Sequence, residues 1–464
     1  ERYFIIKETR PFSMKDKIGY TLGDLGCCCT EQFRAMYLAI FYTLVLKVNP
    51  VHVGILMLIT KFWDAINDPL IGALVDSHKN KGKGKFIPWI KFFAFPTAVL
   101  CILGFVNVSN FAYGARIAYM FITYIVYEIM YTCVSVPFGS LSSVMTDDVN
   151  QRTDLSRFRS LGGTIFMTVI VIAGPLFLYK DNQPVPSHFL IMSAICAVIG
   201  LICLMFTSHW CKELIITEPV VEKKEKLNYF QVIKDITKNK ALLGVMLSSF
   251  IGIVGAGMVN GLNTYLFRDY FGNVAIMAVS GMLSVIWSLI AFVGTKFVAK
   301  KFGKKEWIMY SATFSVVVYA ILFFFPLENP ILFIIINGIC YLGVSGFQVL
   351  VWALVNDAID YQELQTGKRN EGIVYSAYTF FRKLANAVSG SMSSFALAIA
   401  GFQVNEAVQN EAFSGHLWKT YTGLYVVGYL LAVLVLKFIY PLTKEKTAEM
   451  LQDLADKRNA ATAE

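Results

Sequence analysis

Charged residues are scarce in this sequence. They make up 16% of its 464 residues, whereas a soluble domain usually has about 25%. Hydrophobic residues reach 56%, with 37 Phe and 23 Tyr among them. This balance excludes an ordinary soluble domain and indicates an all-α membrane protein. A spanning helix needs roughly 20 apolar residues, so the length allows about twelve spans joined by short loops.

Motifs for catalysis and for ATP use are absent. The sequence holds no G-x-x-x-x-G-K-[ST] loop, no H-E-x-x-H zinc motif and no G-x-S-x-G elbow. Its five histidines fall at the ends of apolar runs or in loops, which argues against a histidine proton relay. The nine cysteines lack metal-ligand spacing, and we interpret them as packing residues. We therefore expect neither an enzyme nor a cofactor.

The net charge of +9 comes from basic residues that lie between the apolar runs. They cluster after every second run, in 79–85, 152–159, 212–240, 296–305 and 368–369. This pattern predicts a multi-pass protein of the cell membrane with these loops and both termini in the cytoplasm. It is a topology signal, so we expect no nucleic-acid partner. The first apolar run carries Asp24, Glu31 and Arg34, and we do not expect a cleaved signal peptide there.

The apolar runs predict twelve spanning helices in two halves. Their approximate bounds are 17–47, 51–76, 87–109, 112–142, 158–179, 187–208, 241–270, 274–299, 306–326, 330–358, 372–402 and 418–441. Similar features recur in spans one and seven, as in Tyr37-Leu38 and Tyr265-Leu266. Two six-helix halves of parallel orientation build the major facilitator fold. We predict an N-terminal bundle over 1–208, a cytoplasmic linker over 209–240, a C-terminal bundle over 241–441 and a cytoplasmic tail over 442–464.

The second span contains two carboxylates at membrane depth. Its central run is Lys61-Phe62-Trp63-Asp64-Ala65-Ile66-Asn67-Asp68-Pro69. Asp64 and Asp68, at i and i+4, share one helix face, with Lys61 one turn below. Intramembrane carboxylates are expensive unless they meet a partner, a cation or water, which makes this face a candidate cation site in the N-terminal bundle. The alternative is that Lys61 neutralises Asp64 as a structural pair.

Spans one and four also carry charge. Glu31 and Arg34 lie near the middle of span one, either as an internal ion pair or facing a substrate. Glu128, Thr132 and Ser135 share one face of span four, at i, i+4 and i+7. Glu128 is placed either to neutralise Arg34 from across the bundle or to contact a substrate.

Two later spans hold basic residues among apolar ones. Arg159 enters span five more deeply than Arg157, which can snorkel to the cytoplasmic face. Thr379 and Lys383 lie well inside span eleven. An intramembrane lysine most often pairs with a carboxylate, and the acidic face of span two is the natural candidate. Arg159, Thr379 and Lys383 are therefore further candidate site residues.

Several segments, in order along the chain, resemble the glycoside–pentoside–hexuronide:cation symporters, the family of the melibiose permease. They are Lys17-Ile-Gly-Tyr20-Thr-Leu-Gly23-Asp24, Trp63-Asp64-Ala-Ile-Asn-Asp68-Pro, Tyr131-Thr132 with Ser135-Val-Pro137-Phe-Gly139, Asn356-Asp357-Ala-Ile-Asp360-Tyr361, and Tyr375-Ser376 with Thr379 and Lys383. The resemblance spans nearly the whole chain. It implies a twelve-helix transporter of the major facilitator type that carries a sugar together with a cation.

The resemblance also implies roles for single residues. Asp64 and Asp68 match the aspartates that bind the coupling cation, so they would be the metal ligands if that ion is Na⁺, and Thr132 matches a residue beside that site. Lys383 matches a lysine near both the cation and the sugar, and Arg159 matches an arginine near the sugar. The candidate substrate-binding residues are Glu31, Arg34, Glu128, Ser135, Arg159, Thr379 and Lys383. By contrast, Cys28, Ser135 and Gly139 stand where the melibiose permease has sugar-binding residues.

The substrate is open at this level. Because an arginine can bind a carboxylate bidentately, Arg34 favours an anionic sugar such as a hexuronide or glucuronide. A neutral glycoside or pentoside is the alternative, followed by a facilitator or a carrier of a non-sugar compound. A remote alternative is a sugar sensor that does not transport and signals through the tail 444–464. Two carboxylates with a hydroxyl favour Na⁺, and a protonatable pair suits H⁺. We expect the chain to function as a monomer in the lipid bilayer.

Overall fold

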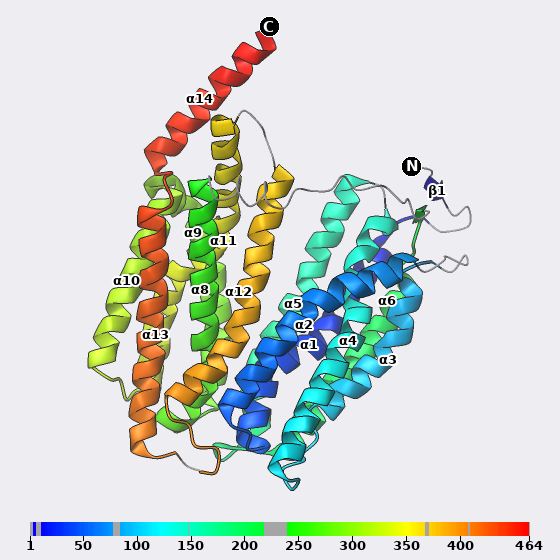
Figure 1. Cartoon of the computed structure of the whole chain (residues 1–464), viewed down its shortest axis with the longest axis vertical. Coiled ribbons are helices and arrows are strands. Elements are labelled where there is room, and N and C mark those ends of the chain that lie inside the picture. The colour runs from blue at the N-terminus through cyan, green and yellow to red at the C-terminus, as the bar shows by residue number, and fades with distance from the viewer. Residues whose placement is uncertain are drawn as a thin grey trace. The chain divides into compact units, whose positions relative to one another are not determined.

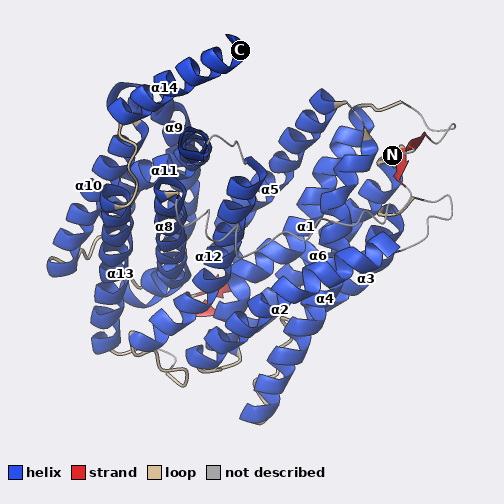
Figure 2. Cartoon of the chain, turned by 45° about the horizontal axis from the view of Figure 1, so that its top comes forward, coloured by secondary structure: helices blue, strands red, loops and turns tan. Residues whose placement is uncertain are grey.

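The structure is a computed structural model that describes residues 3–5, 11–77, 84–146, 148–217, 239–366, 371–406 and 409–463. Helices form nearly all of this part of the chain (Figure 2). The chain divides into two compact units, Glu1–Lys223 with Gln403–Ala407, and Lys224–Phe402 with Val408–Glu464.

The first unit holds six long helices and four short strands (Figure 1). The helices are α1 (Met14–Ile40), continued by the π-helical turn η1 (Phe41–Val45), α2 (Pro50–Ser77), α3 (Ile87–Leu103), α4 (Tyr113–Met145), α5 (Val149–Leu178) and α6 (Pro186–Trp210). The strands are β1 (Tyr3–Ile5), which pairs antiparallel with β4 (Ile215–Thr217), and β2 (Tyr179–Lys180), which pairs with β3 (Gln183–Pro184).

Within its described residues, the second unit repeats the pattern of six long helices and adds a terminal one. They are α8 (Lys240–Tyr265), continued by η2 (Leu266–Tyr270), α9 (Ile276–Phe302), α10 (Lys304–Phe324), α11 (Pro330–Thr366), α12 (Glu371–Ile399), α13 (Glu411–Phe438) and α14 (Lys444–Ala463). A π-helical turn therefore ends the first helix of each unit at an equivalent position.

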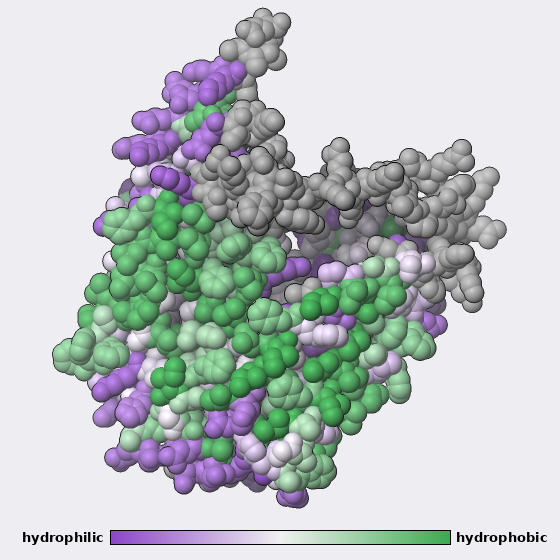
Figure 3. All heavy atoms as spheres, in the orientation of Figure 1, coloured by the Kyte–Doolittle hydropathy of each residue, from purple (hydrophilic) through white to green (hydrophobic). Residues whose placement is uncertain are grey.

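Each of the twelve predicted spans coincides with one long helix, and the predicted all-α membrane fold is confirmed. Seven helices of the described part are long and apolar enough to cross a membrane by composition alone. Helices α1, α2 and α12 are outside that group because charged residues such as Glu31, Lys61 and Lys383 interrupt them. Figure 3 shows hydrophobic side chains over the visible sides of the helices and hydrophilic ones on α14.

Small residues allow the helices of the first unit to approach closely. Helix α1 packs against α5 and α6, α3 against α4 and α6, and α2 against α4. A Cβ atom added to Gly26 of α1 would lie 2.9 Å from the carbonyl oxygen of Gly200 on α6. Aromatic rings in tilted and edge-to-face contact fill the core around Phe33, Phe41 and Phe105. This packing fixes the positions of α1 and α4, which carry several of the candidate site residues.

Glu213 connects the segment after α6 to the start of α3. Its carboxylate accepts backbone N–H groups of Lys85, Phe86 and Ile87 at 2.6, 2.8 and 2.8 Å. A helix start has N–H groups without an intrahelical partner, and a carboxylate satisfies them and complements the helix dipole. Glu213 is buried, and the neighbouring Gly84 has a φ of +83°, where a side chain would be strained and would meet Glu213.

In the second unit, α8 packs against α12 and α13, α10 against α11 and α13, and α9 against α11. Helix α14 docks on α11 and α10 through buried Met450 and Leu454. Residues 218–238, most of the linker predicted over 209–240, lie outside the described residues.

Candidate functional site

The acidic face of α2 holds an ion pair. The Lys61 Nζ atom lies 2.9 Å from Oδ2 of Asp64, and the two side chains are 31% and 20% exposed. The other carboxylate oxygen of Asp64, Oδ1, is buried and accepts no hydrogen bond within the described chain. One turn of helix is enough to bring these two side chains together. Asp64 thus has a cationic neighbour and one oxygen open to a further ligand.

Asp68 is linked to α4. The hydroxyl of Thr132, which is buried, donates to Oδ1 of Asp68 at 3.3 Å. The packing of α2 against α4 brings them together from positions 64 residues apart. Two carboxylates and a hydroxyl therefore lie on one face of α2 and the adjoining face of α4. These are hard oxygen donors, which suit a small cation such as Na⁺.

Arg34 of α1 lies between the aromatic side chains of α4. Its guanidinium carbon is 3.3 Å from the ring centroid of Tyr127 and 4.7 Å from that of Tyr124. Nη1 of Arg34 is 3.9 Å from Oε1 of Glu128, and the Arg34 side chain is only 3% exposed. Nε and Nη1 of Arg34 make no hydrogen bond to the described residues. Arg34 pairs with Glu128 across the bundle, and its donor capacity is not exhausted.

These charges form one network across α1, α2 and α4. Glu128 interacts electrostatically with Glu31, Arg34, Lys61 and Asp64. These five side chains comprise three acidic groups and two basic ones, so full ionisation leaves an excess of negative charge. Such an excess at membrane depth is costly unless a cation or a proton compensates it. The arrangement therefore favours the uptake of positive charge.

The predicted sugar-binding residues Arg159 and Ser135 lie on α5 and α4 of the same unit. Nε of Arg159 donates to Oδ1 of Asp24 at 3.0 Å, and the guanidinium lies over the ring of Phe138. The backbone N–H of Gly163 also donates to Asp24, at 2.9 Å. Arg159 therefore connects α5 to α1 through Asp24, while Ser135 is half-buried on α4.

Thr379 and Lys383 lie on α12 in the second unit. The Thr379 hydroxyl donates to the Tyr375 carbonyl at 2.9 Å, and Lys383 is exposed. The neighbouring Arg382 lies over the ring of Trp352 at 5.5 Å. The pairing of Lys383 with the aspartates of α2 joins residues of different units and stays a prediction.

Sequence reasoning did not anticipate Asp24, Tyr124 and Tyr127. Tyr124, Tyr127 and Glu128 follow one another at helical spacing, so the face that holds Arg34 was detectable from its tyrosines. Asp24 occurs in the sequence one helical turn before Cys28, but nothing in its surroundings indicates Arg159 as the partner. Among the described residues, no three or more His, Cys, Asp and Glu side chains form a metal site.

Comparisons with known proteins give the family and relatives. The model of the family described as MFS/sugar transport protein matches residues 19–444. An uncharacterized symporter of Bacillus subtilis, YjmB, is 32% identical over 97% of both chains. The isoprimeverose transporter of Lactiplantibacillus pentosus is 28% identical over 98% of this chain and 93% of its own. The glucuronide carrier protein homolog of Escherichia coli is 24% identical over 96% of both.

Proposed function

Because the chain belongs to the MFS/sugar transport protein family, we propose that it carries an acidic sugar, a hexuronide or glucuronide, together with a cation. Membership makes it a multi-pass membrane transporter of the secondary, sugar-transporting type and not an enzyme. Coupling to a cation, Na⁺ or H⁺, and the presence of a carboxylate on the sugar are what we propose beyond this membership. The excess of carboxylates around Asp64, beside the Asp68–Thr132 contact, is the observation that supports cation coupling most directly.

The cation binds at Asp64 and Asp68 in this proposal. The two carboxylates are the ligands for Na⁺, or the proton acceptors if the ion is H⁺, and Thr132 adds a hydroxyl to the Asp68 side. The 2.9 Å contact with Lys61 gives Asp64 a cation already. A coupling ion must therefore compete with the Lys61 ammonium, which makes Lys61 an internal competitor.

The released Lys61 has a second carboxylate to meet. Glu128 already interacts electrostatically with Lys61 and lies 3.9 Å from Arg34. When the ion takes Asp64, Lys61 turns towards Glu128, and Glu128 loosens its hold on Arg34. The freed guanidinium then binds the carboxylate of the sugar, aided by its unused Nε and Nη1 donors. Ion binding thus raises the affinity for an acidic sugar.

Transport follows by alternating access. The ion binds first, the sugar follows, and the loaded protein exposes both to the opposite side of the membrane. By thermodynamic linkage, the sugar raises the affinity for the ion by the same factor. Lys383 and Thr379 of α12 and Arg159 of α5 remain candidates for contact with the sugar.

A neutral glycoside or pentoside is the second candidate substrate. The burial of Arg34 at 3% and its pairing with Glu128 favour it, because a structural ion pair leaves no guanidinium for a carboxylate. One relative is named an isoprimeverose transporter and another a glucuronide carrier homolog. The relatives thus include both kinds of sugar.

The proposed setting is the cell membrane, with both termini and the basic loops in the cytoplasm. The distribution of lysines supports this orientation. We propose that one chain is the functional unit, because the predicted cation site lies within one unit of one chain.

The test is initial uptake into proteoliposomes of a β-glucuronide and its neutral β-glucoside, each with an inward Na⁺ gradient at equal pH. Na⁺-stimulated uptake that favours the glucuronide supports the proposal. Preference for the glucoside moves the substrate to the neutral class. A gradient of H⁺ that drives uptake where Na⁺ does not identifies the proton as the coupling ion.

A further inference from the structure

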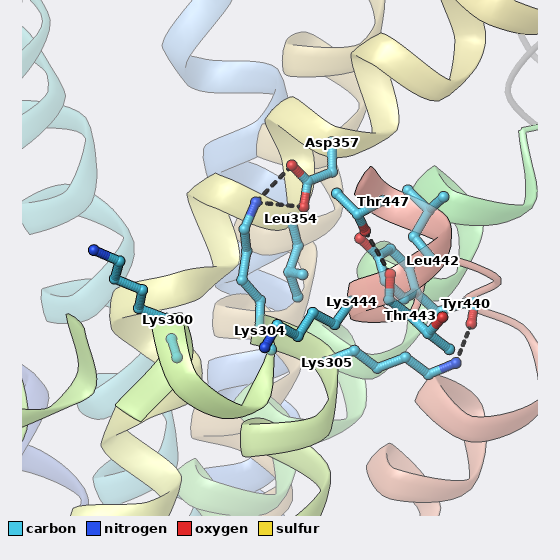
Figure 4. Close-up of a pocket in the computed structure, with 12 residues that line it drawn as sticks. Lys300, Lys304, Lys305, Leu354, Asp357, Tyr440, Leu442, Thr443, Lys444 and Thr447 are labelled. Atoms are coloured by element: carbon cyan, nitrogen blue, oxygen red, sulfur yellow. Dashed lines mark hydrogen bonds and ion pairs between the residues drawn. The ribbon is translucent and has the colours of Figure 1, made fainter. Parts of the chain in front are cut away.

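A small basic cavity lies in the second unit, at the turn between α9 and α10 (Figure 4). Its volume is about 120 Å³, and the end of α9, the start of α10, one turn of α11 and the start of α14 surround it. Lys304, Lys305 and Lys444 line it, with Lys300 at its rim and Asp357 as the lining carboxylate. The residues that line the cavity belong to the second unit, whereas α1, α2 and α4 belong to the first.

The lysine charges around the cavity are only partly compensated. Lys304 contacts both carboxylate oxygens of Asp357 at 2.6 Å. The ammonium of Lys305 donates to the Tyr440 carbonyl at 2.5 Å, and that of Lys444 donates to the Lys301 carbonyl at 2.8 Å. Carbonyl groups satisfy donors without cancelling charge. The ammonium groups of Lys305 and Lys444 therefore bring positive charge to the cavity. Each donates to a carbonyl and not to a carboxylate, while Lys305 also interacts electrostatically with Glu306.

The wall of the cavity includes buried residues and is not formed by exposed surface lysines alone. Lys305 is 8% exposed, and Tyr440 is 1% exposed with a hydroxyl that has no hydrogen-bond partner among the described residues. Gly303, at the turn, has a φ of +103°, and a Cβ atom added there would lie 2.9 Å from Cβ of Lys444. The Glu306 carboxylate accepts the backbone N–H of Lys444 at 3.0 Å. The α9–α10 turn and the start of α14 are thus held together.

We propose that this cavity binds a phosphate group. A volume of about 120 Å³ equals roughly four water molecules in the liquid, enough for one phosphate but small for a sugar or a nucleotide. Phosphate oxygens accept from several ammonium groups at once. To reach one phosphate, Lys304, Lys305 and Lys444 would turn from the Asp357 carboxylate and the Tyr440 and Lys301 carbonyls that they contact in the structure (Figure 4). The group belongs either to the headgroup of an anionic phospholipid or to a free phosphate.

The position of the cavity suits either source. The proposed orientation puts the α9–α10 turn at the cytoplasmic face, where anionic headgroups attract juxtamembrane lysines and soluble phosphates are present. A bound phosphate would bridge the α9–α10 turn and the start of α14. It would therefore stabilise the docked position of α14.

The experiment measures thermal unfolding of the full chain in detergent, with inorganic phosphate titrated against chloride at equal ionic strength. We expect phosphate to raise the midpoint by about 2–5 °C at saturation. Lys444→Gln should remove most of this shift. Lys446→Gln, which takes the same charge from the same helix outside the cavity lining, should keep it.

A second variant should strengthen phosphate binding. Asp357→Asn removes the carboxylate that competes for Lys304, so half-saturation should occur at a phosphate concentration several-fold lower than in the wild type. A parallel arm compares nanodiscs of phosphatidylglycerol with nanodiscs of phosphatidylcholine. Stabilisation by phosphatidylglycerol that Lys444→Gln abolishes, without a response to inorganic phosphate, assigns the site to a lipid headgroup. The proposal is overturned if Lys444→Gln and Lys446→Gln respond alike, or if neither phosphate nor phosphatidylglycerol shifts the wild type.

Discussion

The ammonium of Lys61 lies 2.9 Å from the Asp64 carboxylate, on the face of α2 where the coupling ion is proposed to bind. The same side chain interacts electrostatically with Glu128. Lys61 therefore interacts with two carboxylates. The proposed ion would occupy the first, Asp64, and the second, Glu128, pairs with Arg34. In the proposed function, this relationship would connect the ion site to the sugar site through residues of one unit.

Lys61→Gln removes the internal competitor. We expect the half-saturating Na⁺ concentration of this variant to be about fivefold lower than that of the wild type. This factor corresponds to ~1 kcal/mol, the scale of a partly exposed ion pair. The rise in glucuronide affinity on adding Na⁺ should disappear, because no ammonium remains to move to Glu128. Titration of Na⁺ with and without glucuronide measures both effects. Lys61→Arg is the control that keeps the charge, and an unchanged Na⁺ titration in Lys61→Gln would contradict the competitor role.

Thr132→Val removes the hydroxyl that donates to Asp68. We expect the Na⁺ concentration for half-maximal uptake to rise about tenfold, because an oxygen beside the ion is lost at nearly constant volume. Thr132→Ser keeps the hydroxyl and should stay near the wild type. Equal behaviour of the two variants would show that the hydroxyl has no part in the ion site.

The Arg34–Glu128 pair is tested with a double substitution. Removing Arg34 alone would leave Glu128 buried without its partner and destabilise the fold by several kcal/mol. Arg34→Gln together with Glu128→Gln avoids an unpaired buried charge. We expect this double variant to transport the neutral glucoside and to lose its preference for the glucuronide. Retained preference, measured as a ratio of initial rates, would reduce Arg34 to a structural residue.

Asp24 and Arg159 are expected to stabilise the contact between α1 and α5. The Arg159 side chain is 45% exposed, so a double-mutant cycle with Asp24→Asn and Arg159→Gln should give a coupling of only about 0.5–1 kcal/mol in unfolding. If Arg159 binds sugar as well, Arg159→Gln should raise the KM while Asp24→Asn changes it little. Equal KM changes in both variants would assign Arg159 to the structural pair alone.

Glu213→Ala tests the cap on α3. Three backbone N–H groups lose their acceptor, and we expect the free energy of unfolding to fall by about 2–3 kcal/mol. Glu213→Gln keeps one acceptor oxygen and should lose less. Thermal unfolding of both variants in detergent measures the difference. Identical midpoints in Glu213→Ala and the wild type would show that Glu213 does not stabilise the start of α3.

The helices could be predicted from the sequence because lipid imposes one rule on every span. Each apolar run of about 20 residues becomes a helix, and the breaks carry basic residues. The pair Lys61–Asp64 was suggested by helical spacing, because both residues lie on one face of α2. The pair Arg34–Glu128 was suggested because an intramembrane arginine needs a carboxylate, which span four offers across the bundle. The pair of Arg159 with Asp24 was not, because it depends on how α5 packs on α1. The roles of Asp64, Asp68 and Lys383 in transport stay predictions.

The most direct test of the account is accumulation of a β-glucuronide against its gradient in proteoliposomes, driven by Na⁺ and repeated with an H⁺ gradient. The wild type should accumulate the sugar with one of the two ions. Asp68→Asn should bind the sugar yet bring it only to equilibrium, because the ion no longer has its second carboxylate. If Asp68→Asn still accumulates the sugar under that gradient, the ion does not bind where the account places it.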